Sequence, residues 1–257
     1  MSLTFNLLTV FAAFALKSVC AQDTSSSLAS DLITVPVMTF PKGIGYFAGI
    51  RSTKDGVNFC AGTLIGPSHV LARTSCIVGN IRWVSLGSTF SQGNKDGEQI
   101  KVAVLLPHPN NTAFHNDYLI LELAEETTFK PVRLDSAISM VKPGMKGSRL
   151  GWKDASAQAV ESPHLQGAGV QFVSNELCAT ELTVDDTNLC SRGVSGVKSC
   201  LGDKGGAVIV KDKDHDVLVG YVSQTTGCGK TGGMSVYSRI SAVRPWIDSI
   251  IKGYCVS

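Results

Sequence analysis

Apolar and polar residues alternate in short runs along most of the chain, with Gly, Pro, Asn and Asp between the runs. Runs of this length, rich in β-branched and aromatic residues and bounded by turn-forming residues, predict β-strands. The expected strands are 46–51, 60–65, 69–72, 81–86, 99–106, 118–123, 169–173, 207–211, 217–223 and 235–240. Many short strands with no long helices between them favour an all-β sandwich or barrel.

The C-terminal segment has a different, helical periodicity. Its apolar residues are spaced at i, i+3, i+4, i+7 and i+8 and form one stripe, namely Val243, Trp246, Ile247, Ile250 and Ile251. Ser241 is the expected N-cap, and Pro245 lies early enough in the helix to be tolerated. The pattern therefore predicts a C-terminal α-helix after the last strand.

The first 21 residues have the pattern of a signal peptide. An apolar stretch runs to Leu16 and is followed by Lys17 and by the small residues Val19 and Ala21. The alternative is an uncleaved N-terminal anchor, although the stretch is short for a membrane span. Residues 22–32 are polar and rich in Ser, which predicts a flexible leader, and residues 33–257 are expected to form the folded domain.

Charge and hydropathy exclude two classes of partner. Without Lys17, the chain after the signal peptide has 22 basic residues (23 minus 1) and 21 acidic residues. This balance gives no electrostatic reason to expect nucleic acid or an anionic membrane surface. No later stretch approaches the roughly 20 consecutive apolar residues that a spanning helix needs. We therefore expect a secreted, extracellular protein.

The cysteines indicate an oxidising compartment. Cys20 falls in the signal peptide, and seven cysteines remain. Spacing alone does not fix the connectivity, but pairing of near neighbours gives Cys60–Cys76, Cys178–Cys190 and Cys200–Cys228. Cys255 is then left over, either as a free thiol or as a disulfide to another chain. A zinc site is the alternative, but no C-x-x-C pair exists and the histidines are scattered, so we expect no metal and no cofactor.

Five segments, in order along the chain, resemble landmarks of the trypsin-like serine proteases. They are 60–65 (CAGTLI), 69–76 (HVLARTSC), 116–121 (NDYLIL), 200–207 (CLGDKGGA) and 235–240 (SVYSRI), the last followed by Trp246 in the expected helix. The resemblance covers about residues 45–252. It implies two six-stranded β-barrels with an active-site cleft between them and a C-terminal α-helix.

The resemblance also implies that the catalytic triad is degenerate. Chemistry in this family needs a hydroxyl nucleophile, an imidazole base and a carboxylate that holds the imidazole. The carboxylate position is Asp117, but the imidazole position is Ser75 and the nucleophile position is Lys204. His69 lies six residues before Ser75, too far along the sequence for a one-residue shift to restore the base. We therefore expect no hydrolysis by the family mechanism.

Other parts of the protease machinery are also altered. The family's activation step frees an amine that pairs with the acid before the nucleophile. That acid persists as Asp203. Residues 31–37, however, do not have the sequence of the terminus that activation exposes, and no Lys or Arg lies shortly before them as a cleavage site. At the specificity pocket, Lys198 takes the floor position, and the wall contains Ser223 and Thr225. A cationic floor and a branched wall would exclude a basic side chain.

Ser75 and Lys204 allow two interpretations. A Ser-Lys dyad would be an enzyme with displaced catalytic groups, but Ser75 would not face the oxyanion hole. The other interpretation is structural: Asp117 has lost its imidazole and needs compensation, which Lys204 and the Ser75 hydroxyl could supply. We expect this structural role.

A narrower resemblance suggests a partner. Residues 50–53, 56–65, 67–71 and 95–98 are similar to the glucanase inhibitor proteins that plant-pathogenic oomycetes secrete. Membership would imply a pseudoprotease that binds a plant endo-β-1,3-glucanase in the host apoplast. The alternatives are a binding or adhesion protein with another target and an active protease. Asn110, in the triplet 110–112, is a candidate N-glycosylation site in a surface loop.

Overall fold

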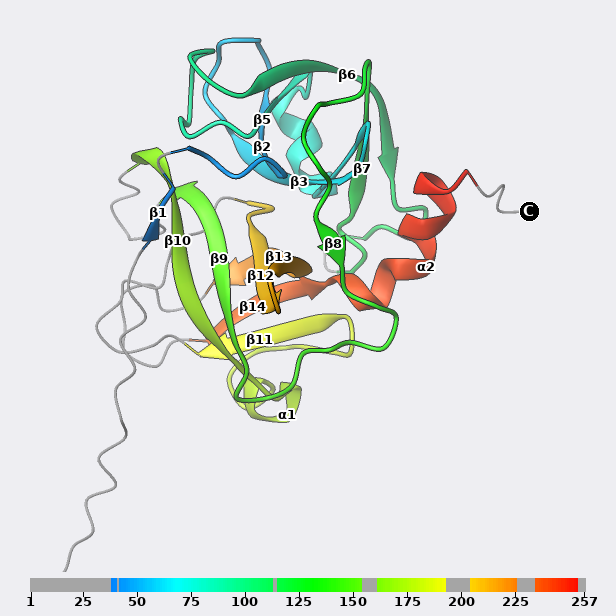
Figure 1. Cartoon of the computed structure of the whole chain (residues 1–257). Coiled ribbons are helices and arrows are strands. Elements are labelled where there is room, and N and C mark those ends of the chain that lie inside the picture. Colours follow the sequence, from blue (N-terminus) through cyan, green and yellow to red (C-terminus); the bar gives the residue numbers. More distant parts are fainter. Residues whose placement is uncertain are drawn as a thin grey trace, which may run out of the picture. The chain divides into compact units, whose positions relative to one another are not determined.

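Two sets of antiparallel strands make up most of the fold, and each set closes into a barrel of six strands (Figure 1). The computed structural model describes residues 38–40, 42–112, 115–153, 161–192, 204–225 and 234–253, all of which belong to one compact unit. The predicted all-β, trypsin-like double barrel with a C-terminal helix is confirmed.

The first barrel has the strand order β2-β3-β4-β7-β6-β5. Its strands are β2 (Phe47–Arg51), β3 (Cys60–Gly66), β4 (His69–Ala72), β5 (Trp83–Leu86), β6 (Glu98–Pro107) and β7 (Leu119–Leu123). A 3-10 helix, η1 (Thr74–Gly79), follows β4. Alternate residues point inward, so that Ile50, Val84 and Ile100 meet in the barrel core.

The second barrel runs β9-β10-β11-β14-β13-β12 and closes where β12 pairs with β9. Its strands are β9 (Lys146–Lys153), β10 (Glu161–Val173), β11 (Asn188–Arg192), β12 (Ala207–Asp212), β13 (His215–Thr225) and β14 (Met234–Arg239). Two short strands lie outside this circle: β1 (Met38–Thr39) pairs with β10, and β8 (Arg133–Leu134) runs parallel to β13. A single-turn helix, α1 (Asn175–Cys178), precedes β11.

A shared apolar core joins the two barrels. Phe47 and Ile120 from the first barrel pack in one cluster with Trp152 and Tyr221 from the second, and the Phe47 and Trp152 rings are 4.9 Å apart. Helix α2 (Ile240–Ile251) adds its apolar stripe to the same cluster, including Ile247. The core therefore lies between the barrels as well as inside them.

The structure corrects two details of the sequence analysis. Helix α2 begins at Ile240 with Arg239 as its N-cap, and Ser241 is a buried residue of the first turn, so the predicted Ser241 cap is wrong. Strands β9 and β11 were not predicted, and β10 is much longer than expected. In β9, a fully buried Arg149 occupies a core position over the Tyr237 ring, which breaks the apolar alternation that marks a strand.

Candidate functional site

The acid Asp117 lies at the junction of the two barrels, just before β7. Strand β4 is antiparallel to β7 with Ala72 opposite Leu119, so the residues that follow β4 come close to those that precede β7. Asp117 therefore meets Arg73 and Ser75, at the start of η1. This brings together two of the three positions that the sequence predicted for a degenerate triad, Ser75 and Asp117.

Asp117 is neutralised by Arg73. Arg73 Nε donates to Asp117 Oδ2 at 2.7 Å, and Arg73 Nη2 lies 2.5 Å from the same oxygen. The Ser75 amide donates to Oδ1 at 2.9 Å, and the Ser75 hydroxyl to Oδ2 at 3.2 Å. The side chains of Arg73 and Asp117 are only 14% and 13% exposed, so the ion pair is largely shielded from water.

Lys204 does not take part in this pair. Lys204 is exposed. Among the described residues, Asp117 forms its ion pair with Arg73 and not with Lys204. The expected Lys204–Asp117 pair is therefore wrong, whereas the expected hydrogen bond from the Ser75 hydroxyl is present. The backbone of Lys204 does contribute, because its carbonyl accepts from the Ala61 amide at 2.9 Å and so ties the turn before β12 to β3.

Arg73 also reaches the second barrel. Its Nη1 donates to the carbonyls of Val222, at 3.3 Å, and Ser223, at 3.0 Å, both in β13. One guanidinium thus links the carboxylate of Asp117 to the backbone of the opposite barrel. The Ser223 carbonyl lies at the bulge of β13 between Val222 and Gln224, where the regular pairing with β14 is interrupted.

Two buried tyrosines hold the same region together. The Tyr118 hydroxyl donates to the Arg239 carbonyl at 2.8 Å, and the Tyr221 hydroxyl donates to the Asp117 carbonyl. Their rings meet edge to face with centroids 5.2 Å apart. Burial raises the pKa of both phenols above the ordinary value, so both remain neutral donors. Sequence reasoning missed these residues because each acts through contacts far away in the chain.

Several predicted site positions lie outside the described residues. These are the pocket-floor residue Lys198, the acid Asp203, the pair Cys200–Cys228, Cys255 and residues 1–37. Thr225 is the last residue of β13, and Ser223 is partly buried two residues earlier. The specificity-pocket interpretation therefore stays a prediction.

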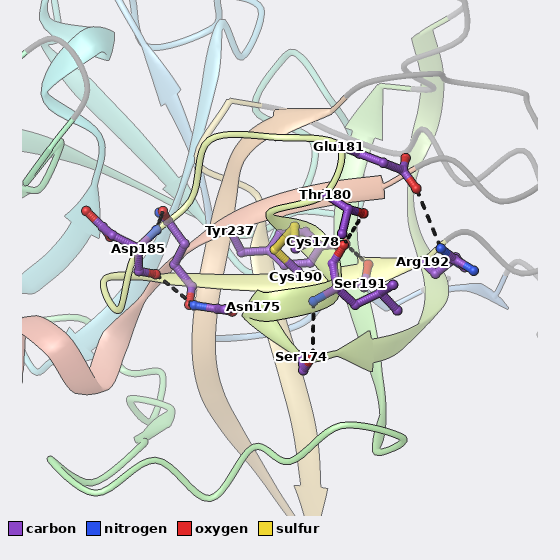
Figure 2. The surroundings of a disulfide bond; sticks show 12 residues. Ser174, Asn175, Cys178, Thr180, Glu181, Asp185, Cys190, Ser191, Arg192 and Tyr237 are labelled. Atoms are coloured by element: carbon purple, nitrogen blue, oxygen red, sulfur yellow. Dashed lines mark hydrogen bonds and ion pairs between the residues drawn. A yellow bond between two sulfur atoms is a disulfide. The ribbon is translucent and has the colours of Figure 1, made fainter.

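A pocket of about 660 Å³ opens where the loop before Asp117 meets the second barrel. Its lining residues are His115, Glu181, Leu182, Thr183, Val184, Asp185, Asn188, Ser223 and Val236. The wall formed by residues 181–188 rests on the Cys178–Cys190 disulfide, as Figure 2 shows. No sequence signal indicated this pocket, because it forms between segments that are distant along the chain.

The wall of this pocket is held by polar contacts. Asn175 Nδ2 donates to the carbonyls of Asp185, at 2.7 Å, and Asn188, at 3.2 Å (Figure 2). Hydrogen bonds from Thr187 hold the pKa of the Asp185 carboxyl below its usual value, and the nearby His115 adds to this effect. His115 Nδ1 lies 3.1 Å from Asp185 Oδ2 across the mouth of the pocket. These contacts hold the wall of the pocket in place.

The disulfides and the glycosylation loop can be placed directly. The structure contains Cys60–Cys76, which joins β3 to η1, and Cys178–Cys190, which joins α1 to β11. Asn110 is exposed in the loop after β6, and its carbonyl accepts from Asn116 Nδ2 at 3.2 Å. Asn110 thus lies in a surface loop, and its glycosylation stays a prediction.

The described residues give no sign of a metal centre or a membrane helix. Within the ranges given above, no group of three or more His, Cys, Asp or Glu side chains is arranged to hold a metal ion. In the same part of the chain, no helix is both long and apolar enough to cross a bilayer.

Comparison with known proteins agrees with this fold. Residues 40–247 match the family model described as Trypsin. The chain belongs to the trypsin family. Among its relatives in that family, glucanase inhibitor protein 3 of Phytophthora infestans is 42% identical over 218 residues, which cover 81% of this chain and 84% of the relative. Glucanase inhibitor protein 2 of Phytophthora sojae is 39% identical over 217 residues, covering 80% and 75% of the two chains. Glucanase inhibitor protein 4 of Phytophthora infestans is 40% identical over 223 residues, covering 82% and 87%.

Proposed function

We propose that this trypsin-family chain is a secreted, catalytically inactive protein that binds and inhibits an endo-β-1,3-glucanase of a plant host. Support for the target comes from relatives at 39–42% identity that are named glucanase inhibitor proteins. Support for inactivity comes from the positions that family resemblance assigns to the base and the nucleophile, which carry Ser75 and Lys204.

The observation that carries the proposal is the Arg73–Asp117 ion pair. In a working triad the carboxylate orients an imidazole and stabilises its protonated form. Here the carboxylate is bonded by Arg73 and Ser75, and none of its hydrogen bonds or ion pairs among the described residues involves a histidine. The acid thus serves the structure, and loss of base or nucleophile costs about a millionfold in rate in comparable enzymes.

The same arginine argues against capture of an extended peptide in the cleft. A peptide that adds to a sheet edge needs free backbone acceptors there. Arg73 Nη1 already donates to the Val222 and Ser223 carbonyls, so a peptide would compete with the guanidinium for these acceptors. A folded partner recognised through surface loops fits this arrangement better than a peptide substrate does.

An inhibition assay tests the proposed target. The purified protein is mixed with a plant endo-β-1,3-glucanase, and release of reducing sugar from laminarin is measured against protein concentration. We expect saturable inhibition, and the reduced and alkylated protein should not inhibit. Full glucanase activity in the presence of excess native protein, combined with no recovery of a glucanase from apoplastic fluid by pull-down, would reject the target.

A separate assay tests inactivity. A fluorophosphonate probe labels the activated serine of serine hydrolases, and we expect no labelling of the native protein. Labelling at Ser75, abolished in a Ser75→Ala variant, would support the Ser-Lys dyad instead. Mass spectrometry of the protein from culture medium tests the remaining parts of the proposal: we expect a mature terminus at Gln22 and a glycan on Asn110.

A further inference from the structure

A tryptophan on the outer face of the first barrel lies in a row with two basic residues. Trp83 of β5 is directly opposite Arg51 of β2 and Lys101 of β6. The adjacent row points into the barrel core, so by the alternation of a strand this row points outward. Figure 1 shows the three strands side by side in the barrel.

Two lysines approach the same indole ring. Lys101 Nζ lies 5.5 Å from the ring centroid of Trp83, and Lys54 Nζ lies 5.7 Å from it. Both lysines are exposed, and in the described part of the chain neither ammonium group forms an ion pair. A cation–π contact at an exposed site is weak, and the two ammonium groups repel each other across one ring. Among the described residues, no carboxylate is paired with either ammonium group of the cluster.

A buried arginine fixes the position of Lys54. Arg51 is fully buried and donates from Nη1 to the carbonyls of Lys54, at 3.2 Å, and Gly93, at 2.5 Å. Its Nε donates to Asn58 Oδ1 at 2.6 Å. These bonds hold the loop between β2 and β3 against the loop between β5 and β6. The backbone of Lys54 is thus set beside Trp83 before any ligand arrives, which lowers the cost of ordering it on binding.

Two acids of the neighbouring loops, Asp55 and Asp96, act on Arg51 through the charge of their carboxylates. The Asp96 carboxylate also accepts from the Ser88 hydroxyl at 2.6 Å and from the Thr89 amide at 2.7 Å. Asp55 is exposed and follows Lys54 directly, yet it forms no ion pair with that lysine among the described residues. The ammonium groups of Lys54 and Lys101 remain available to an anion.

We propose that Lys54, Trp83 and Lys101 form a binding site for an anionic polysaccharide, with one uronic acid residue stacked on the indole. A pyranose ring presents a face of C–H groups comparable in size to an indole ring. In the free protein the two ammonium groups lie over the ring, 5.5 and 5.7 Å from its centroid. On binding, these flexible side chains would swing aside and pair with the carboxylate that projects from the edge of the stacked sugar. A neutral glucan would leave the ammonium groups unpaired. A nucleic acid calls for a broader basic surface than a secreted chain with 22 basic (23 minus 1) and 21 acidic residues provides.

Binding of polygalacturonate to the full secreted protein tests this site. Affinity is measured by calorimetry with polygalacturonate, with neutral laminarin and with polyglutamate. We expect binding to polygalacturonate and none to laminarin, and the double variant Lys54→Gln with Lys101→Gln should weaken binding by at least about tenfold. The matched control is Lys130→Gln with Lys142→Gln, which removes the same charge from two exposed lysines elsewhere, and it should bind within about twofold of wild type.

A third variant separates a glycan from an acidic protein segment. Trp83→Leu should weaken polygalacturonate binding and leave any weak polyglutamate binding unchanged, because only the sugar uses the indole face. The proposal fails if the two double lysine variants lose affinity for polygalacturonate equally, if laminarin binds as well as polygalacturonate, or if none of the three polymers binds. Polyglutamate binding that equals polygalacturonate binding and is insensitive to Trp83→Leu would assign the site to an acidic protein. Should Trp83→Leu fail to fold, the comparison between the two double lysine variants still tests the proposal.

Discussion

Among the described residues, Arg73 is the ion-pair partner of Asp117, so the stability of the site should depend on this arginine. Replacing Arg73 by Met would leave a carboxylate that is only 13% exposed without its cation. We expect a loss of about 3 kcal/mol in the free energy of unfolding, measured by urea denaturation. Lys204→Met should change stability by less than about 0.5 kcal/mol, because the Lys204 side chain is exposed.

A double variant shows whether that loss comes from the stranded charge. Adding Asp117→Asn to Arg73→Met removes the carboxylate and should recover part of the stability. Equal losses in the Arg73 and Lys204 variants would contradict the assigned ion pair. If Lys204→Met lowers stability and adding Asp117→Asn recovers it, the Lys204–Asp117 pair predicted from the sequence would be supported instead.

The role of Asp117 could be predicted from the sequence, but that of Arg73 could not. The acid stands in a recognisable motif, and its need for a partner follows from the missing imidazole. Arg73 reaches Asp117 only because β4 and β7 pair with Ala72 opposite Leu119. Such a register depends on contacts between distant strands, and local sequence patterns do not contain it. Lys204 was chosen by its place in a motif, which says nothing of where its flexible side chain points.

At the scale of elements, Gly205 sets the contact between the turn before β12 and strand β3. Its φ is +82°, and a Cβ atom there would lie 2.4 Å from the Ala61 carbonyl oxygen. Gly205→Ala should therefore cost more than the roughly 1–2 kcal/mol of a left-handed backbone alone, as measured by denaturation. Gly144→Ala is the matched control, because Gly144 has φ +87° but nothing within 4 Å of the added atom. Equal costs at the two glycines would show that Gly205 is not closely packed.

The docking of α2 should depend on pH through His108. The rings of His108 and Trp246, the latter in α2, meet edge to face with their centroids 4.8 Å apart. His108 Nδ1 also accepts a hydrogen bond from the Asn110 amide at 3.2 Å. Burial lowers the pKa of His108 below its ordinary value of 6.5. On acidification the unfolded chain therefore binds a proton at this histidine at a higher pH than the folded chain does. The stability that neutral His108 contributes is fully present above pH 6.5 and is lost as the pH falls through the pKa of His108 in the folded state.

Melting temperatures measured between about pH 7.5 and about pH 5 test this dependence. The His108→Gln variant should lose less stability on acidification than wild type. His215→Gln, at an exposed histidine of β13, is the control and should follow the wild-type profile. Parallel profiles for wild type and His108→Gln would reject a role for this ring.

The strands show where sequence patterns succeed and where they fail. Strand β4 was predicted at its observed bounds, because its apolar run ends sharply at turn residues. Strand β9 was missed because Gly147, Arg149 and Gly151 interrupt its apolar residues. Arg149 takes a buried position over the Tyr237 ring where a hydrophobic pattern would require an apolar residue. The helix α2 was predicted from its stripe, whereas its first residue was not, since Arg239 caps it without a side-chain hydrogen bond.

At the scale of the molecule, the topology followed from five ordered motifs, but the joining of the barrels did not. The core that unites them draws Phe47 and Ile120 from one barrel and Trp152 and Tyr221 from the other. Polar contacts add to it, including the Tyr46 hydroxyl, which donates to Asp216 Oδ2 at 2.6 Å. The Phe47–Trp152 and Tyr46–Asp216 contacts each join residues more than a hundred positions apart, so they form only once both barrels are in place.

Because the barrels share this core, we expect them to unfold in one transition. The chain contains three tryptophans: Trp83 in the first barrel, Trp152 in the second and Trp246 in α2. Variants that keep one tryptophan, with Phe at the other two positions, report on each part by fluorescence. Under non-reducing conditions all three should give the same urea midpoint, coincident with far-UV circular dichroism.

Phe47→Ala probes the coupling directly. Phe47 is fully buried, and its ring lies 4.9 Å from that of Trp152, so its truncation should cost about 3–5 kcal/mol. If the barrels are coupled, the midpoints reported by Trp83, Trp152 and Trp246 will fall together. A fall confined to the Trp83 reporter would mean that the first barrel unfolds on its own and that the shared core does not couple it to the second. Leu86→Ala, inside the first barrel and absent from the shared cluster, is the control. With coupling it too should lower all three midpoints, because the free energy of a single transition is common to every residue that contributes to it.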